Sequence, residues 1–241
     1  MDLNISKITS DILTKVNRQP IFIKPVIPVH FEAQLMYKLF KSCYAELNGV
    51  EFIENKESKA FVYTLIYYFQ NNEKFFNSAL LFSLPETQNS LSKGLLIVGG
   101  FGTGKSTCLK TFQYLLNIKF DSGVHLKFQT AIGVVSDFEN TPQEGISDFY
   151  NKHSKGFRVF DDLKGEKIAS RFGKSDLFQD ILFNRFENDR IITIILCNYA
   201  DDSPCNIEAA IDEFNRYSGR ILDRIYGKFN IVELKGKSFR K

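Results

Sequence analysis

The sequence is poor in the features that mark membrane, secreted and metal-cluster proteins. No apolar run approaches the ~20 residues that a membrane-spanning helix needs. Residues 1–7 lack the charged and then apolar layout of a secretory signal peptide. Cysteine occurs only four times, at positions 43, 108, 197 and 205, without a metal-ligand spacing. We therefore expect a reduced, cytoplasmic protein with no membrane partner.

An excess of charge of one sign is also missing. The net charge is +3, from 31 basic and 28 acidic residues. This charge does not require a strongly basic surface for nucleic acid, although it is compatible with a local basic patch. Apolar residues make up 44% and charged residues 24%, which is ordinary for a soluble protein. The length of 241 residues is enough for one α/β core and an appendage.

From residue 94 onward, apolar runs alternate with segments of helical spacing, which is typical of a parallel α/β sheet. We expect strands at 94–98, 124–130, 157–160, 191–196 and 229–234. Helices are expected at about 105–117, 131–139, 144–152, 176–188, 206–216 and 218–226. The predicted fold class is therefore α/β, with a central parallel five-stranded sheet flanked by helices.

Residues 1–90 follow a different pattern. Prolines at 20, 25 and 28 predict an extended arm, and amphipathic spacing predicts a helix at 31–47. A second helix, rich in aromatic residues, is expected at 56–71, and an apolar helical segment near 73–82. A turn-rich stretch at 85–90 is interpreted as a linker, which divides the chain into units 1–90 and 91–241. The 24 Phe and 10 Tyr are typical of a hydrophobic core, and stacking on nucleic-acid bases is the alternative.

A glycine-rich segment between the first strand and the first helix of the second unit carries the strongest chemical signal. It fits G-x-x-x-x-G-K-[ST], the phosphate-binding P-loop, whose backbone N–H groups and helix N-terminus bind phosphate oxygens. We expect Lys105 to reach the β- and γ-phosphates and Ser106 to be a Mg²⁺ ligand. The predicted nucleotide-binding residues are Gly99, Gly100, Phe101, Gly102, Thr103, Gly104, Lys105, Ser106 and Thr107.

Polar residues end two later buried strands. Asp161 follows an apolar run and is predicted to associate with the metal ion, as the acidic residue of a Walker B motif, with Asp162 beside it to polarise the attacking water. Asn198 is the polar residue at the end of the apolar run 191–198 and is predicted to contact the γ-phosphate or that water. A strand-end turn is the alternative for the two acids and for the asparagine.

Arginines recur near the C-terminus, at positions 216, 220, 224 and 240. Arg220 and Arg224 lie four residues apart and so share a helix face. An arginine presented to the γ-phosphate of a neighbouring subunit accelerates phosphoryl transfer. A solvated charged face is the alternative.

Together, five segments resemble the DnaC/IstB-like branch of AAA+ ATPases, which contains bacterial helicase loaders and transposon helper ATPases. They are the P-loop, RVFDDL at 158–163, TIILCN at 193–198, YSGRILDRI at 217–225 and KGKSFR at 235–240. The resemblance covers about residues 90–241 and implies an AAA+ ATPase domain over 91–241 that uses ATP and Mg²⁺. Arg224 matches the arginine finger of the family, and Arg240 a late arginine that senses the nucleotide.

The resemblance also implies partners. As a loader, the protein would self-assemble into a ring or spiral and bind a replicative helicase and single-stranded DNA, with residues 1–90 as the partner-binding module. As a transposition helper, it would bind duplex DNA and a transposase. A small-molecule kinase and a nucleotide-gated binding module remain alternatives.

The chain departs from the family pattern at three places. Asp162 stands where Glu is commoner, and because the side chain of Asp is shorter, we expect slow ATP hydrolysis. Lys164 occupies a position that is often Gly, and the segment 200–215 is longer than usual.

Overall fold

The computed structural model describes residues 24–28, 30–83, 88–120, 124–170 and 176–239. Most of the predicted N-terminal arm and the predicted nucleotide contact of Arg240 therefore lie outside the described residues. None of the described helices is both long and apolar enough to cross a membrane.

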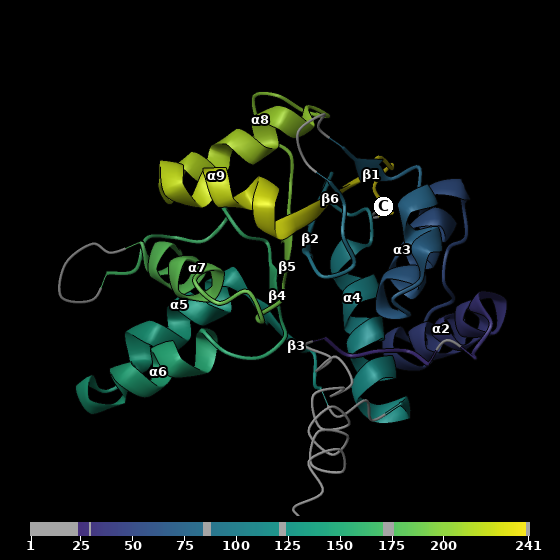
Figure 1. The fold of residues 1–241 in the computed structure, drawn as a ribbon, viewed down its shortest axis with the longest axis horizontal. Helices are drawn as coiled ribbons and strands as arrows, with labels where there is room; N and C mark the ends of the chain where they lie inside the picture. The colour runs from purple at the N-terminus through teal and green to yellow at the C-terminus, as the bar shows by residue number, and fades with distance from the viewer. Residues whose placement is uncertain (1–23, 29, 84–87, 121–123, 171–175, 240–241) are drawn as a thin grey trace, which may run out of the picture.

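A mostly parallel sheet forms the centre of the protein (Figure 1). Five parallel strands lie in the order β6-β2-β5-β4-β3, and β1 adds an antiparallel edge to β6. The predicted five-stranded sheet is confirmed in its parallel part and gains this sixth strand. The strands are β1 (Leu81–Phe82), β2 (Gly94–Gly99), β3 (Lys127–Thr130), β4 (Arg158–Asp161), β5 (Thr193–Cys197) and β6 (Phe229–Leu234).

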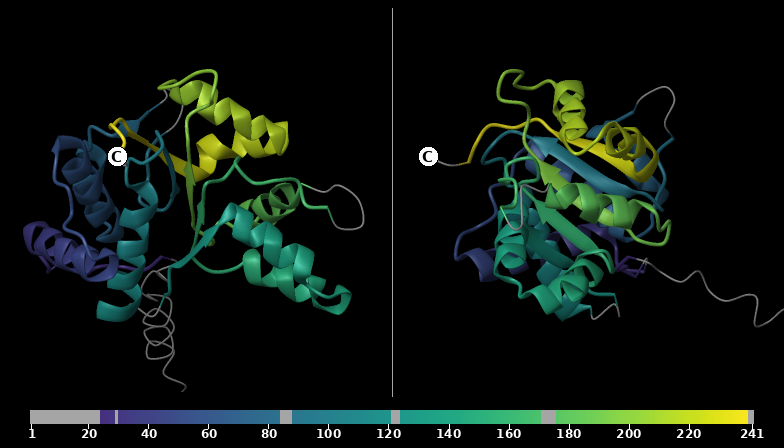
Figure 2. Two further views of the ribbon diagram at one scale, coloured as in Figure 1. Left: turned by 180° about the vertical axis from the view of Figure 1, so that it is seen from behind. Right: turned by 90° about the vertical axis from the view of Figure 1, so that its left-hand side faces the viewer.

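Helices cover both faces of the sheet. The α-helices are α2 (Ala33–Asn48), α3 (Lys56–Phe69), α4 (Lys105–Tyr114), α5 (Ala131–Asn140), α6 (Ile146–His153), α7 (Leu177–Phe186), α8 (Ile207–Asp212) and α9 (Gly219–Lys228). Short 3₁₀ segments are η1 (Glu73–Asn77), η3 (Gln143–Gly145) and η4 (Glu213–Arg216), and η2 (Leu115–Lys119) is a π-helical turn that continues α4. Figures 1 and 2 show α2, α3 and α4 on one side of the sheet and α5 to α9 on the other.

The alternation of side chains along each strand divides the core between these two layers. Leu95 and Ile97 of β2 belong to the cluster under α2, α3 and α4, whereas Leu96 and Val98 belong to the cluster under α5 to α9. All four are fully buried. Strands buried on both faces are continuously apolar, which is why these runs could be recognised from the sequence.

The helices of the N-terminal part pack directly on the sheet layer. Phe40 of α2 and Phe69 of α3 contact the ring of Phe112 in α4, with ring centroids 5.1 and 5.4 Å apart. The start of α3 is fixed by a capping box, in which the Asn55 side chain accepts from Ser58 N and Ser58 Oγ accepts from Asn55 N. The amphipathic faces predicted from the sequence are thus buried against α4 and each other.

One expected helix is wrong. The segment near 73–82 was expected to be helical, but only η1 is helical there, as a 3₁₀ turn, and β1 follows as an extended pair of residues. The backbone of Leu81 and Phe82 pairs with Val232 and Ile231 of β6. Pairing with β6 at the sheet edge therefore outweighs the weak helical tendency of this short apolar run.

Candidate functional site

The P-loop joins β2 to α4 at the carboxyl edge of the parallel sheet, where ligands of such sheets bind. Gly104, the residue before α4, has φ +89°, a left-handed conformation that residues with a side chain rarely adopt. This turn sends the chain directly into the helix, so that the first N–H groups of α4 face the loop. Phe101 at the tip of the loop is 62% exposed.

Lys105 lies inside the loop rather than in solvent. Its side chain is buried, and Nζ donates to the carbonyl oxygens of Gly99 at 2.6 Å and Gly100 at 2.8 Å. Nζ also donates to Oδ1 of Asn198 at 3.1 Å. The lysine predicted to bind phosphate and the polar residue that follows β5 therefore meet at one point.

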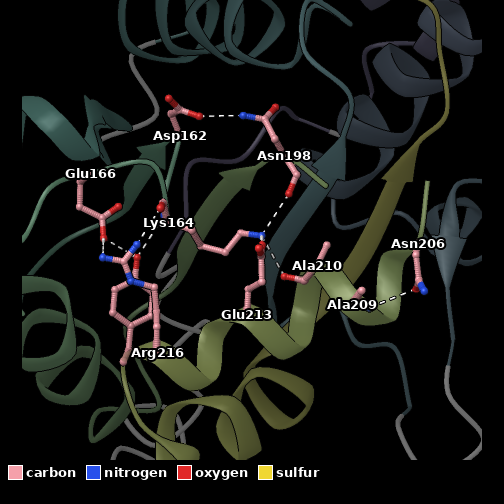
Figure 3. A network of polar contacts seen from close by, with 10 residues as sticks. Asp162, Lys164, Glu166, Asn198, Asn206, Ala209, Ala210, Glu213 and Arg216 are labelled. Atoms are coloured by element: carbon pink, nitrogen blue, oxygen red, sulfur yellow. Dashed lines mark hydrogen bonds and ion pairs between the residues drawn. The ribbon is translucent and has the colours of Figure 1, made fainter. Parts of the chain in front are cut away.

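Asn198 connects this ammonium group to an acidic residue. Its Nδ2 donates to Oδ1 of Asp162 at 2.8 Å, as Figure 3 shows. Because Oδ1 of Asn198 accepts from Lys105 and Nδ2 donates to Asp162, both ends of the amide have a defined partner. Lys105, Asn198 and Asp162 form one hydrogen-bonded chain across the carboxyl ends of three strands.

Ser106 and Asp161 form a second polar pair beside this chain. Ser106 Oγ donates to Asp161 Oδ1 at 2.7 Å. Burial raises the pKa of the Asp161 carboxyl, and the hydrogen bond from Ser106 opposes that shift. A bound cation would favour the charged carboxylate in the same way.

The chemistry of this pair suits Mg²⁺. A hydroxyl and a carboxylate supply oxygen ligands, and Mg²⁺ takes few protein oxygens together with substrate phosphates. Within the described ranges, no group of three or more His, Cys, Asp and Glu side chains is placed to hold a metal ion. The residues therefore fit a metal ion that is shared with a phosphate group.

A cavity of about 790 Å³ opens over these side chains. Besides the P-loop, Asp161, Asp162 and Asn198, it is lined by the connection between α2 and α3, where Val50 and Ile53 are 60% and 58% exposed. This wall could not be predicted from the sequence, because nothing in the apolar spacing of 50–53 indicates which cavity it faces. Further lining residues that were not predicted are Tyr44, Phe61, Thr130, Ile132 and Phe239.

The end of the described chain also returns to the P-loop. Phe239 N donates to Gly102 O at 2.9 Å, and the Phe239 ring lies beside Gly104. One signal in the sequence points to this contact, since Phe239 stands in the KGKSFR segment. The structure thus brings that segment to the glycine-rich turn.

Arg224 is placed elsewhere. It lies on α9, donates to Glu187 Oε1 at 2.5 Å and stacks over the ring of Phe183 in α7. It does not line the cavity of its own chain. Its predicted contribution to catalysis in a neighbouring subunit stays a prediction.

Two cysteines close to the site are structural. Cys108 of α4 and Cys197 of β5 are buried, and burial raises the pKa of the Cys108 thiol to about 12 and of the Cys197 thiol to about 11. Both thiols are therefore protonated at neutral pH and act as small apolar side chains.

Comparison with known proteins gives a structural answer only. No protein-family model matches the chain, and no curated protein sequence does. Among solved structures, the DnaC helicase loader superposes with a TM-score of 0.53 at 20% identity, over 80% of this chain and 98% of that one. DnaI has a TM-score of 0.47 at 17% identity, over 78% and 89% of the two chains. AMPPCP-bound DnaA from Aquifex aeolicus has a TM-score of 0.47 at 18% identity, over 76% of this chain and 48% of that one.

The superposition on the DnaC helicase loader covers 80% of this chain and 98% of that one. At this level of identity it establishes the fold. The chain therefore has the fold of the DnaC helicase loader, with a glycine-rich P-loop sequence between β2 and α4.

Proposed function

We propose that this protein binds ATP with Mg²⁺ and hydrolyses ATP slowly. The observation that carries the proposal is the hydrogen-bonded chain from Lys105 through Asn198 to Asp162, beside the Ser106–Asp161 pair and under a cavity of about 790 Å³. A phosphate-binding cation, a metal-binding oxygen pair and an acid that faces water are the groups that phosphoryl transfer to water requires.

The hydrolysis reaction assigns a task to each side chain. A water oxygen attacks the γ-phosphorus, the bond to the β–γ bridging oxygen breaks, and ADP and inorganic phosphate result. Lys105 neutralises charge on the phosphate oxygens, and Asn198 orients the water or the γ-phosphate. Asp162 accepts a hydrogen bond from the water and polarises it. Ser106 and Asp161 would hold Mg²⁺, which supplies further neutralisation of phosphate charge.

We further propose that ATP controls loading of a replicative helicase onto single-stranded DNA during replication. The DnaC-like fold supports this proposal, together with the five sequence segments that resemble loaders and helper ATPases. In this role the chains self-assemble into a ring or spiral. Arg224 of one subunit then acts on the γ-phosphate held by the next, and residues 1–90 bind the helicase.

The first test is nucleotide binding by the full chain, measured with a fluorescent ATP analogue and Mg²⁺. Lys105→Ala removes charge-assisted bonds to phosphate, so the affinity should fall about 10- to 100-fold. Lys152→Ala is the matched control, because this lysine is exposed on α6. Equal affinity of the two variants would refute the nucleotide site.

The second test separates the roles. Turnover that rises with protein concentration and with single-stranded DNA supports a loader, since the arginine acts between subunits. Filaments that form only on duplex DNA would instead indicate a transposition helper. Turnover that requires an added metabolite and ignores DNA would indicate a kinase and overturn the loader proposal.

A further inference from the structure

The turn after β4 holds two residues in an unusual backbone conformation. Asp162 has φ +58° and Lys164 has φ +78°, in the left-handed region that favours glycine. Aspartate adopts this region more readily than most residues, but lysine has no local side-chain bond that compensates. Lys164 therefore occupies this position at a cost in backbone strain.

The Lys164 side chain crosses from this turn to the end of β5, to α8 and to η4 (Figure 3). It is 8% exposed, and Nζ donates to the carbonyl oxygen of Asn198 at 3.1 Å and to that of Ala210 in α8 at 3.0 Å. Nζ also forms an ion pair with Glu213 of η4. These three acceptors use the full donor capacity of an ammonium group.

The backbone of Lys164 is held by the same region of the chain. Its N–H donates to the Tyr217 hydroxyl at 3.1 Å, and its carbonyl oxygen accepts from Nη1 of Arg216 at 2.7 Å. Tyr217 in turn donates to the buried carboxylate of Glu166 at 2.6 Å. The segment directly before α9 therefore fixes both the main chain and the side chain of this residue.

Asn198 is the point at which this cluster meets the candidate site. Its carbonyl accepts from Lys164, while its side chain accepts from Lys105 and donates to Asp162. Asn198 directly follows the last residue of β5, at the point where the chain leaves the strand. The direction of its amide thus depends on what holds its backbone.

We propose that Lys164 is a positioning residue for ATP hydrolysis: it fixes the backbone of Asn198, and thereby the Asn198 amide against Asp162, to the segment that leads into α9. The inference rests on the proposed ATPase function and adds a residue that does not itself touch the nucleotide. It gives the lysine a reason to occupy a left-handed position, since a glycine there would relieve the strain but supply no ammonium group.

The test is Lys164→Met in the full chain, which keeps the aliphatic stem and removes the three polar contacts. Because misplacement of a catalytic group by about 1 Å can cost ~100-fold in rate, we expect kcat for ATP to fall about 10-fold. The Kd for a fluorescent ATP analogue should stay within about twofold, since Lys105 and the P-loop are untouched. The matched control is Lys167→Met, whose side chain is 62% exposed and pairs with Glu139.

A spectroscopic measurement makes the test independent of turnover. The side-chain amide resonances of Asn198, assigned through Asn198→Asp, report its hydrogen bonds to Asp162 and Lys105. They should shift in Lys164→Met and stay unchanged in Lys167→Met. If Lys164→Met does not fold, Glu213→Gln weakens the same cluster and should shift them less, with a loss of about two- to threefold in kcat.

The outcomes separate the two proposals. Unchanged Asn198 resonances and an unchanged kcat in a folded Lys164→Met variant would overturn the positioning role. A Kd that weakens as much as kcat falls would also overturn it, because the lysine would then merely support the loop. Absence of ATP turnover in the wild-type protein overturns the proposed function, and the Asn198 resonances then still decide whether Lys164 positions this side chain.

Discussion

His153 is predicted to make the stability of the protein strongly dependent on pH. It ends α6, is fully buried and packs against the Phe149 ring, with ring centroids 4.3 Å apart. Within the described part of the chain, neither ring nitrogen has a hydrogen-bond partner. Burial, and then the charges of Arg158, Lys152 and Arg185, lower the pKa of His153 from 6.5 to about 3.

The sign and size of the effect follow from this pKa. In the unfolded chain the imidazole takes up a proton near pH 6.5, whereas the folded protein keeps it neutral until about pH 3. The contribution of neutral His153 to stability is therefore complete above pH 6.5 and is lost progressively as the pH falls toward 3. The slope is about 1.4 kcal/mol per pH unit, or about 2 kcal/mol between pH 7 and pH 5.

The assay is urea unfolding of wild type and His153→Phe at pH 7, 6 and 5. Phenylalanine keeps an aromatic contact with Phe149 and cannot titrate. The free energy of unfolding of the wild type should fall by about 2 kcal/mol more than that of the variant over this range. Other titrating groups contribute equally to both proteins, so the difference isolates His153. His125→Gln, at an exposed position, is the control and should follow the wild type. Parallel pH profiles for wild type and His153→Phe would refute the reasoning.

Three further predictions concern the site and the sheet. Asp162→Asn should keep the ATP affinity within about twofold of wild type but lower kcat by at least ~10-fold in steady-state assays, because an amide accepts a weaker hydrogen bond from water than a carboxylate does. An unchanged kcat would show that Asp162 takes no part in hydrolysis. Arg224→Ala should lower the ATP turnover that rises with protein concentration. It should change the free energy of unfolding by less than about 1 kcal/mol, since the ion pair of Arg224 with Glu187 lies largely at the surface. Intact turnover of the assembled variant would contradict the assignment of Arg224 as an arginine finger. Gly94→Ala should lower the free energy of unfolding by about 3 kcal/mol in urea titrations, because the added Cβ would lie 2.1 Å from Thr193 O. A stability equal to wild type would contradict this, since β2 and β5 would then move apart at no cost in free energy.

The parallel sheet and the grouping of the P-loop with Asp161 and Asn198 could be predicted because each carries a local constraint. Doubly buried strands must be continuously apolar, and a P-loop must place glycines between a strand and a helix. The polar residues Asp161 and Asn198 end such strands, and parallel strands bring their carboxyl ends to one edge. Motif order was therefore enough to place these groups near one another.

The rest of the cavity depends on tertiary contacts that leave no local signature. The segment 50–53 reaches the cavity because α2 and α3 pack against the sheet layer, and amphipathic spacing does not specify which partner a helix face contacts. Lys164 could be noted as a departure from the family pattern, but its three acceptors come from residues 34 to 49 positions away. The strand β1 was missed because two residues are too few to show a period of two.

The contact between Phe239 and the P-loop makes an intrinsic optical probe possible. The chain contains no tryptophan, so Phe239→Trp would create the sole indole fluorophore of the protein. Its ring would stand beside Gly104, at the mouth of the cavity that we assign to ATP. The emission of that single indole would then follow nucleotide arrival and departure in real time, with no dye attached to the ligand.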